Sequence, residues 1–176
     1  YALAPENPYP AGINDCIYAT KWFINNAALY KGDGSKMAVA GDSAGGYMAI
    51  STAQKLKSEG ISLRAQVVVY PVTDHYSAGH PSWVENKEGY ILSADMMQWF
   101  WDNFITDPTK FEKASPLRSK NLEGLPPAFI ATANYDPLRD EGKAYADKLK
   151  AAGAEVTYGN YENVHGFFAT GEMGQD

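Results

Sequence analysis

Residues 38–46 read AVAGDSAGG, a short apolar run that is typical of a β-strand and that breaks at a Gly-x-Ser-x-Gly turn. The sequence after the turn is helix-forming, so Ser43 is expected at a sharp strand-to-helix corner, the layout of a nucleophile elbow. Such a corner projects the serine Oγ above the sheet and requires small neighbours, because a side chain there would clash with the adjacent strand or helix. The amide of Ala44 would then open the helix, where unpaired N–H groups and the helix dipole favour a negatively charged oxygen. This stretch therefore predicts a nucleophilic serine with an oxyanion donor beside it.

Outside this corner, strand-like and helix-like segments alternate along the chain. Apolar residues at helical spacing predict a helix over about 11–28, and a second helix follows the turn and ends at Gly60. Continuous apolar and β-branched runs predict strands at 65–70 and 127–133, followed by a helix over 137–153 and a last strand at 155–161. Alternation of this kind predicts an α/β fold with a mostly parallel sheet and helices on both of its faces.

The segment 72–125 lacks this periodicity and is rich in aromatic residues. A long excursion between strands is more often a lid or a pocket wall than a plain connection. We therefore expect it to contribute part of a cap or a pocket wall, with Trp99 as a candidate substrate contact. The alternative is that Trp99, Phe100 and Phe104 only attach a helix to the core.

Three chemically active residues come directly after predicted strands, namely Ser43, Asp136 and His165. Because the carboxyl ends of parallel strands meet at one edge of a sheet, we expect the three side chains to lie together there. A hydroxyl is a weak nucleophile at neutral pH, so it needs an imidazole to take its proton and a carboxylate to orient that imidazole. The sequence therefore predicts Ser43 as nucleophile, His165 as general base and then acid, and Asp136 as the orienting carboxylate.

These roles have competitors in the sequence. Asp136 is also suited to cap the helix that follows it, and Asp140 on that helix is a weaker candidate for the orienting role. His75 follows a strand end closely enough to rival His165. Cys16 is expected to be a buried thiol on a helix face rather than a nucleophile.

The composition of the 176 residues fits one ordinary globular domain, with 45% hydrophobic and 13% aromatic residues to fill a core. A net charge of −6 with interspersed charges argues against a nucleic-acid partner. No stretch approaches the roughly 18 apolar residues of a membrane span. A single cysteine suits a reducing compartment, so we expect a cytoplasmic protein.

Five blocks of the sequence, in this order, resemble the signature motifs of the hormone-sensitive-lipase-like branch of the α/β hydrolases, in its GDSAGG subgroup. They are YALAPE at 1–6, GDSAGG at 41–46, YPVTD at 70–74, DPLRDEG at 136–142 and HGF at 165–167. The resemblance implies an α/β-hydrolase fold and a serine carboxylesterase that acts on short- to medium-chain acyl esters through an acyl-enzyme, with no metal and no organic cofactor. It also implies that Ser43, Asp136 and His165 form the catalytic triad and that Ala44 supplies one oxyanion-hole amide.

A small-molecule ester is the partner that the resemblance implies, and three residues are candidate contacts to it. Tyr47 stands where the family commonly has Asn, and it either narrows the pocket or simply packs. Phe167, within the histidine motif, is the third candidate beside Tyr47 and Trp99.

The sequence also departs from the family pattern. The His-Gly-Gly-Gly loop that supplies the other oxyanion donors should lie before Tyr1, and no His-Gly-Gly occurs in these residues. We therefore expect residues 1–176 to be the C-terminal portion of one catalytic domain, incomplete at both ends. A non-catalytic ligand-binding protein or receptor on the same scaffold is the alternative function, and a homodimer is one compatible assembly.

Overall fold

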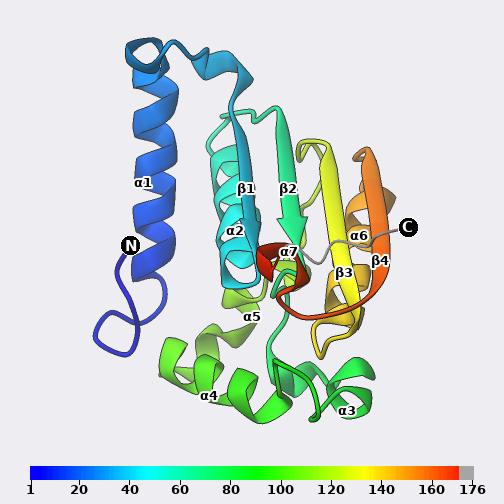
Figure 1. The fold of residues 1–176 in the computed structure, drawn as a ribbon. Coiled ribbons are helices and arrows are strands. Elements are labelled where there is room, and N and C mark those ends of the chain that lie inside the picture. The colour runs from blue at the N-terminus through cyan, green and yellow to red at the C-terminus, as the bar shows by residue number, and fades with distance from the viewer. Residues whose placement is uncertain (171–176) are drawn as a thin grey trace.

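The computed structural model describes residues 1–170, and at its centre is a four-stranded parallel sheet (Figure 1). The strands lie in the order β1-β2-β3-β4, with Ala40 opposite Val67 and Val67 opposite Phe129. Their bounds are β1 (Ala38–Asp42), β2 (Ala65–Val69), β3 (Ala128–Tyr135) and β4 (Val156–Val164). The four predicted strands are therefore confirmed, although β3 and β4 run past their predicted ends.

Helices and short turns precede, connect and follow these strands. The longer helices are α1 (Ala11–Asn26), α2 (Ala44–Ser58), α4 (Ala94–Phe104) and α6 (Arg139–Ala151), and the shorter ones are α3 (Ser82–Glu85), α5 (Phe111–Ala114) and α7 (Phe167–Thr170). Short 3-10 turns add η1 (Ala27–Tyr30), η2 (Gly34–Lys36), η3 (Tyr76–Ala78), η4 (Pro108–Lys110) and η5 (Pro116–Arg118). Within residues 1–170, no helix has both the length and the apolar character needed to cross a membrane.

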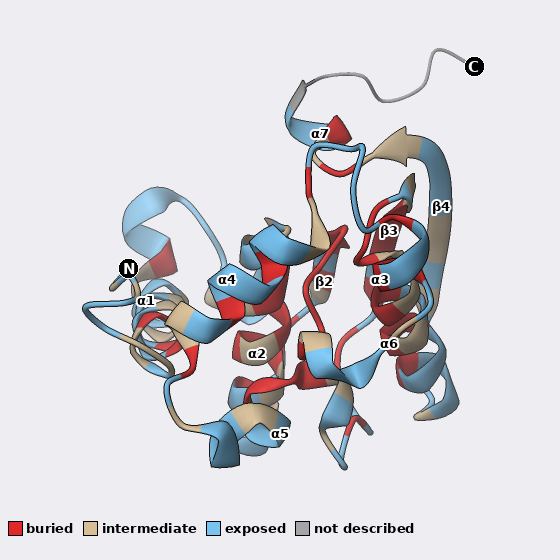
Figure 2. Cartoon of the chain, turned by 90° about the horizontal axis from the view of Figure 1, so that it is seen from below, coloured by how far each residue is buried: buried red, intermediate tan, exposed pale blue. Residues whose placement is uncertain are grey.

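The two crossover helices α2 and α6 cover the same face of the sheet, as both views show (Figures 1 and 2). The strands lie in the sheet in the same order as in the chain. Right-handed crossovers between such strands all lie on one face of the sheet. On the opposite face, Val67 and Phe129 are 38% and 36% exposed. In the described part of the chain, the short α7 packs on that face through Phe167, against Ala131 and Ala133 at the carboxyl ends of the strands. Helices were expected on both faces of the sheet. The structure has α2 and α6 along one face, whereas α7 covers the other face only near the carboxyl ends of the strands.

Helix α1 packs on α2 through the buried side chains of Ile13 and Ile17. Cys16 is only half-buried, with its Sγ 3.5 Å from Met48 Sδ, so the expected buried thiol lies instead at the rim of this contact. Burial nonetheless raises the pKa of the Cys16 thiol, which disfavours the nucleophilic thiolate.

Helix α4 lies at the carboxyl ends of the strands, the end from which Figure 2 views the molecule. Met97 and Trp101 attach it to the core, and both are almost fully buried. Trp99 is 61% exposed and Phe100 is also exposed, so these two do not attach the helix as the alternative interpretation expected. Phe104 does so in part, since it packs at the edge of the core.

The Ser43 corner has the strained geometry that the sequence predicts. Ser43 has φ 54° and ψ −120°, which an L-residue rarely adopts. A Cβ added to Gly41 would lie 2.3 Å from the backbone of Gly45, so β1 and the first turn of α2 meet without room for a side chain. A Cβ added to Gly46 would lie 2.9 Å from Pro71, whereas one added to Gly45 would meet only Asp42 Oδ1, at 4.0 Å.

We expect Gly41→Ala to lower the free energy of unfolding by more than about 2 kcal/mol, because backbone atoms cannot yield as a flexible side chain can. Gly45→Ala is the matched control, and it should change that free energy by less than about 1 kcal/mol. Urea denaturation of both variants in the full-length protein measures the difference. Equal effects of the two substitutions would contradict the close approach.

Candidate active site

The sheet brings Ser43, His165 and Asp136 together, although they are far apart in the sequence. Ser43 follows β1, Asp136 follows β3 and His165 follows β4. The imidazole lies between the other two side chains, with Nε2 2.9 Å from Ser43 Oγ and Nδ1 2.7 Å from Asp136 Oδ2. If Nδ1 carries the proton, it donates to the carboxylate and Nε2 is free to accept the serine proton. The arrangement is therefore able to activate the Ser43 hydroxyl.

Asp136 is placed for both of the roles that the sequence left open. Its carboxylate is fully buried, and Oδ2 contacts His165 while Oδ1 accepts a hydrogen bond from Leu138 N at 2.9 Å. One oxygen thus orients the turn before α6, and the other faces the imidazole. Capping and orientation are compatible because a carboxylate has two acceptor atoms.

The competing residues are engaged elsewhere. Asp140 accepts hydrogen bonds from Ser82 N at 2.8 Å and from Arg139 Nε at 2.8 Å. His75 is almost fully buried, and its ring stacks on Phe111 with centroids 3.8 Å apart. Burial lowers the pKa of His75, so it stays neutral within the aromatic core.

The backbone around Ser43 is held by the chain that follows β2. Ser43 N donates to Val69 O at 2.9 Å, and Ser43 O accepts from Tyr47 N at 3.1 Å and from Val72 N at 3.4 Å. Ala44 is the first residue of α2, so its amide has no carbonyl partner within the helix. That amide is thus placed where a donor to an oxyanion is needed.

A cavity of about 420 Å³ opens beside Ser43 and Ala44. Tyr47 and Trp99, two of the predicted substrate contacts, line it. Tyr47 also packs edge-on against Trp101 and Phe104, with ring centroids 6.1 and 5.6 Å apart, so it both bounds the cavity and belongs to the core. Burial raises the pKa of the Tyr47 phenol.

Phe167, the third predicted substrate contact, is not one of the residues that line this cavity. Its side chain is 1% exposed and packs edge-on against Tyr70, with ring centroids 5.3 Å apart. The short helix α7 turns the ring back onto the sheet, a direction that proximity to His165 in the sequence does not reveal.

The segment 72–125 also supports the turn that carries Asp136, through residues that the sequence did not single out. Ser82 N donates to Asp140 Oδ2 at 2.8 Å, and Ser82 Oγ donates to Pro137 O at 2.6 Å. Asn86 Nδ2 donates to Asp136 O at 3.1 Å. Both residues are isolated polar positions in an aperiodic stretch, so no pattern marked them.

Glu141, fully buried in the first turn of α6, fixes the start of the same segment. Its carboxylate accepts hydrogen bonds from Thr73 N at 2.7 Å, Asp74 N at 3.1 Å and Trp83 Nε1 at 3.0 Å. Burial raises the pKa of Glu141 to about 7, although these donors act in the opposite direction. The chain after β2 is thereby tied to the helix after Asp136.

Asp74 anchors a second ionic group close by. Its Oδ1 accepts from Arg118 Nε at 2.6 Å and from His75 N at 2.9 Å, and its Oδ2 lies 3.2 Å from His80 Nε2. Burial alone raises the pKa of Asp74, but His80, Arg118 and the His75 amide outweigh burial and lower it to about 2. Asp74 therefore stays ionised, and it raises the pKa of His80.

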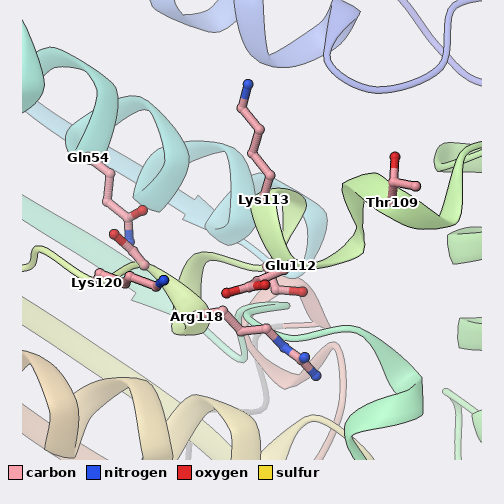
Figure 3. Close-up of a pocket in the computed structure, with 8 residues that line it drawn as sticks. Gln54, Thr109, Glu112, Lys113, Arg118 and Lys120 are labelled. Atoms are coloured by element: carbon pink, nitrogen blue, oxygen red, sulfur yellow. The ribbon is translucent and has the colours of Figure 1, made fainter.

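A second cavity, of about 400 Å³, lies against α2, α5 and η5 and has a polar lining (Figure 3). It is lined by Gln54, Thr109, Glu112, Lys113, Ser115, Arg118, Ser119 and Lys120, and so by none of the predicted site residues. No group of three or more His, Cys, Asp or Glu side chains in residues 1–170 is arranged to hold a metal ion. The Ser43 cavity is therefore the candidate site.

Comparison with known proteins agrees with this geometry. A family model described as "alpha/beta hydrolase fold" matches residues 1–169. Carboxylesterase NlhH of Mycobacterium tuberculosis is 43% identical over 174 residues, covering 95% of this chain and 54% of that protein. Esterase LipI of the same species is 39% identical over 172 residues, covering 95% of this chain and 53% of that protein.

Solved structures give the same result. A thermostable esterase from Pseudomonas putida ECU1011 superposes with a TM-score of 0.91 at 44% identity, covering 95% of this chain and 54% of the other. The chain thus spans about half the length of the relatives that it matches.

We expect Asp74→Asn to lower the free energy of unfolding at pH 7 by about 2 kcal/mol, because charged hydrogen bonds to Arg118 and His80 are lost. The ordinary pKa of Asp is 3.8 and the folded value is about 2, so the carboxylate stabilises the fold fully above pH 4. That contribution is lost as the pH falls from about 4 to 2, where wild type and variant should converge.

Urea unfolding between pH 2 and pH 7 measures this convergence. Asp147→Asn is the control, since Asp147 pairs with Lys143 on the exposed face of α6 and should contribute little to the free energy of unfolding. A difference between wild type and Asp74→Asn that is constant over the whole range would contradict the assignment.

Proposed function

The chain belongs to the α/β hydrolase fold family, in its hormone-sensitive-lipase-like branch, and on that premise we propose that it is part of a serine carboxylesterase with Ser43, His165 and Asp136 as its catalytic triad. The observation that carries the proposal is the continuous path from Ser43 Oγ to His165 Nε2, 2.9 Å, and from His165 Nδ1 to Asp136 Oδ2, 2.7 Å. Relatives with the names carboxylesterase and esterase support the reaction class.

The geometry supports a two-step acyl transfer. His165 Nε2 takes the proton of Ser43 as Oγ attacks the ester carbonyl carbon, and Asp136 stabilises the imidazolium that forms. The amide of Ala44 donates to the carbonyl oxygen as it becomes an oxyanion. His165 then gives its proton to the departing alcohol, which leaves an acyl group on Ser43. A water molecule, deprotonated by His165, attacks this acyl-enzyme, and the carboxylic acid and free Ser43 are released.

The cavity beside Ser43 favours an ester of modest size. Its volume of about 420 Å³ lies toward the small end of the range of ligand pockets. Most of its lining side chains are apolar, among them Met97, Trp99 and Phe100, which suits an alkyl or aryl acyl group rather than a charged one. A short- to medium-chain acyl ester is therefore the substrate class that we propose. Residues 72–125, which include α4, would serve as part of the cap over it.

Assembly and location rest on the sequence. A homodimer and a cytoplasmic location stay predictions, and light scattering and cell fractionation of the full-length protein test them. The alternative function, a ligand-binding protein on the same scaffold, predicts that small esters bind without turnover.

Asp136→Asn separates catalysis from capping. Asn retains a carbonyl oxygen that accepts from Leu138 N, so the free energy of unfolding should change by less than about 1 kcal/mol. Its amide group, however, would donate to His165 Nδ1 and force the wrong imidazole tautomer, so kcat should fall by about 10³- to 10⁴-fold. Hydrolysis of a p-nitrophenyl ester and urea unfolding measure the two effects.

His165→Ala in the same ester assay completes the test. An esterase should lose turnover in both variants, while a binding protein should show no turnover in wild type and should keep its affinity for the ester. An Asp136→Asn protein with wild-type kcat would rule out Asp136 as the orienting carboxylate.

Trp99→Ala tests the wall of the cavity. We expect KM for a p-nitrophenyl ester to rise about 5-fold with kcat nearly unchanged, because an apolar contact of about 1 kcal/mol is lost equally from substrate and transition state. Trp22→Ala on α1 is the control, since Trp22 is partly exposed and does not line this cavity. An unchanged KM in Trp99→Ala would show that the side chain does not contact the substrate.

A further inference from the structure

Tyr70, at the end of β2, has a backbone conformation that a bulky residue rarely adopts. Its φ is 36°, in the left-handed region that favours glycine. A residue in such a conformation costs about 1–3 kcal/mol and persists only where the surroundings over-determine it. Pro71 follows, and proline further restricts the residue before it. Contacts in the surrounding structure therefore impose this backbone conformation on Tyr70.

The contacts on either side of Tyr70 explain why the backbone turns there. Val69 O accepts the hydrogen bond from Ser43 N at 2.9 Å, and Val72 N donates to Ser43 O at 3.4 Å. Tyr70 N donates to Ala131 O at 2.6 Å, which keeps the end of β2 against β3. The chain must therefore turn sharply between two points that are both attached to Ser43.

The side chain that this turn directs inward lies against the catalytic histidine. Tyr70 is 1% exposed, and its ring is 4.4 Å from the His165 ring between centroids, with 50° between the planes. Its ring also packs edge-on against Phe167, with ring centroids 5.3 Å apart. The phenol donates a long hydrogen bond, 3.4 Å, to Asp42 Oδ2 in the Ser43 corner.

Burial and the nearby Asp42 carboxylate raise the pKa of Tyr70 to about 12, so the phenol keeps its proton and acts as a donor to that carboxylate. The side chain thus touches the loop that carries His165 on one side and the corner that carries Ser43 on the other.

We propose that Tyr70 is a positioning residue, whose ring holds the His165 imidazole in line with Ser43 Oγ and whose strained backbone is the cost of that placement. The inference rests on the proposed esterase function. The hydrogen bonds of His165 to Asp136 and Ser43 involve its two ring nitrogens and lie in the plane of the ring, so they only weakly restrain a tilt about the line through Nδ1 and Nε2. A ring packed against the imidazole, with centroids 4.4 Å apart, removes this freedom, and small misplacements of a catalytic group lower the rate strongly.

The test replaces Tyr70 in the full-length protein and measures kcat and KM for a p-nitrophenyl ester. Tyr70→Leu should lower kcat by about 10- to 100-fold with KM within about twofold, because the imidazole is misaligned while the substrate cavity is unchanged. Tyr70→Phe should keep kcat within about threefold of wild type, since it retains the ring and loses only the hydroxyl, with its long hydrogen bond to Asp42 and its contacts with the backbone of Phe168 and Ala169.

Tyr161→Leu is the matched control. Tyr161 packs on Phe167 with ring centroids 5.6 Å apart, so Tyr161→Leu removes a contact with the same ring that Tyr70 contacts. It should keep kcat within about twofold of wild type. Should Tyr70→Leu fail to fold, Tyr70→Met fills the same space with a flexible side chain and should show the same loss of kcat.

A folded Tyr70→Leu or Tyr70→Met with wild-type kcat, or a loss of kcat as large in Tyr161→Leu, would overturn the inference. A wild-type protein without esterase activity would instead refute the proposed function. A crystal structure of Tyr70→Leu decides the positioning role independently of turnover. The inference expects the His165 imidazole to leave its position 2.9 Å from Ser43 Oγ, and an unmoved imidazole would contradict it.

Discussion

The close approach of β1 to the first turn of α2 is the constraint on which the rest of the site depends. Gly41 leaves no room for a side chain against Gly45, and Ser43 accepts a strained backbone conformation so that the chain can pass from strand to helix in one residue. The end of β2 holds this corner through the amide and the carbonyl of Ser43. As a result, the hydroxyl and the Ala44 amide occupy fixed positions at the carboxyl edge of the sheet.

The other parts of the site are arranged around that corner. Asp136 and His165 reach it because β3 and β4 end at the same edge as β1, and parallel pairing keeps those ends together. The segment between β2 and β3 does more than form the cavity wall. Through Ser82, Asn86 and the buried Glu141 it is bonded to the turn and helix that follow β3, so the cavity and the carboxylate are supported by the same stretch of chain.

Much of this organisation could be predicted from the sequence, because it depends on local patterns. Apolar β-branched runs marked the strands, and chemically active residues directly after them marked the three members of the proposed triad. The sequence is less informative where long-range packing decides. The apolar run of β2 indicates coverage on both faces, yet the order of the strands places the crossover helices on one. Phe167 lies next to His165 in the chain, but α7 turns it away from the cavity. Tyr70 was predicted only as the last residue of a strand, because no sequence pattern indicates its positive φ or its contact with His165.

The most direct measurement of the central claim is the intact mass of the full-length protein after treatment with a fluorophosphonate, with Ser43→Ala as control. Fluorophosphonates react with a serine that a neighbouring imidazole activates, and not with an ordinary surface hydroxyl. An activated Ser43 predicts a mass increase of a single probe group that is absent in Ser43→Ala. An unmodified wild-type protein that is folded and full-length, or an adduct that persists in Ser43→Ala, would contradict the triad.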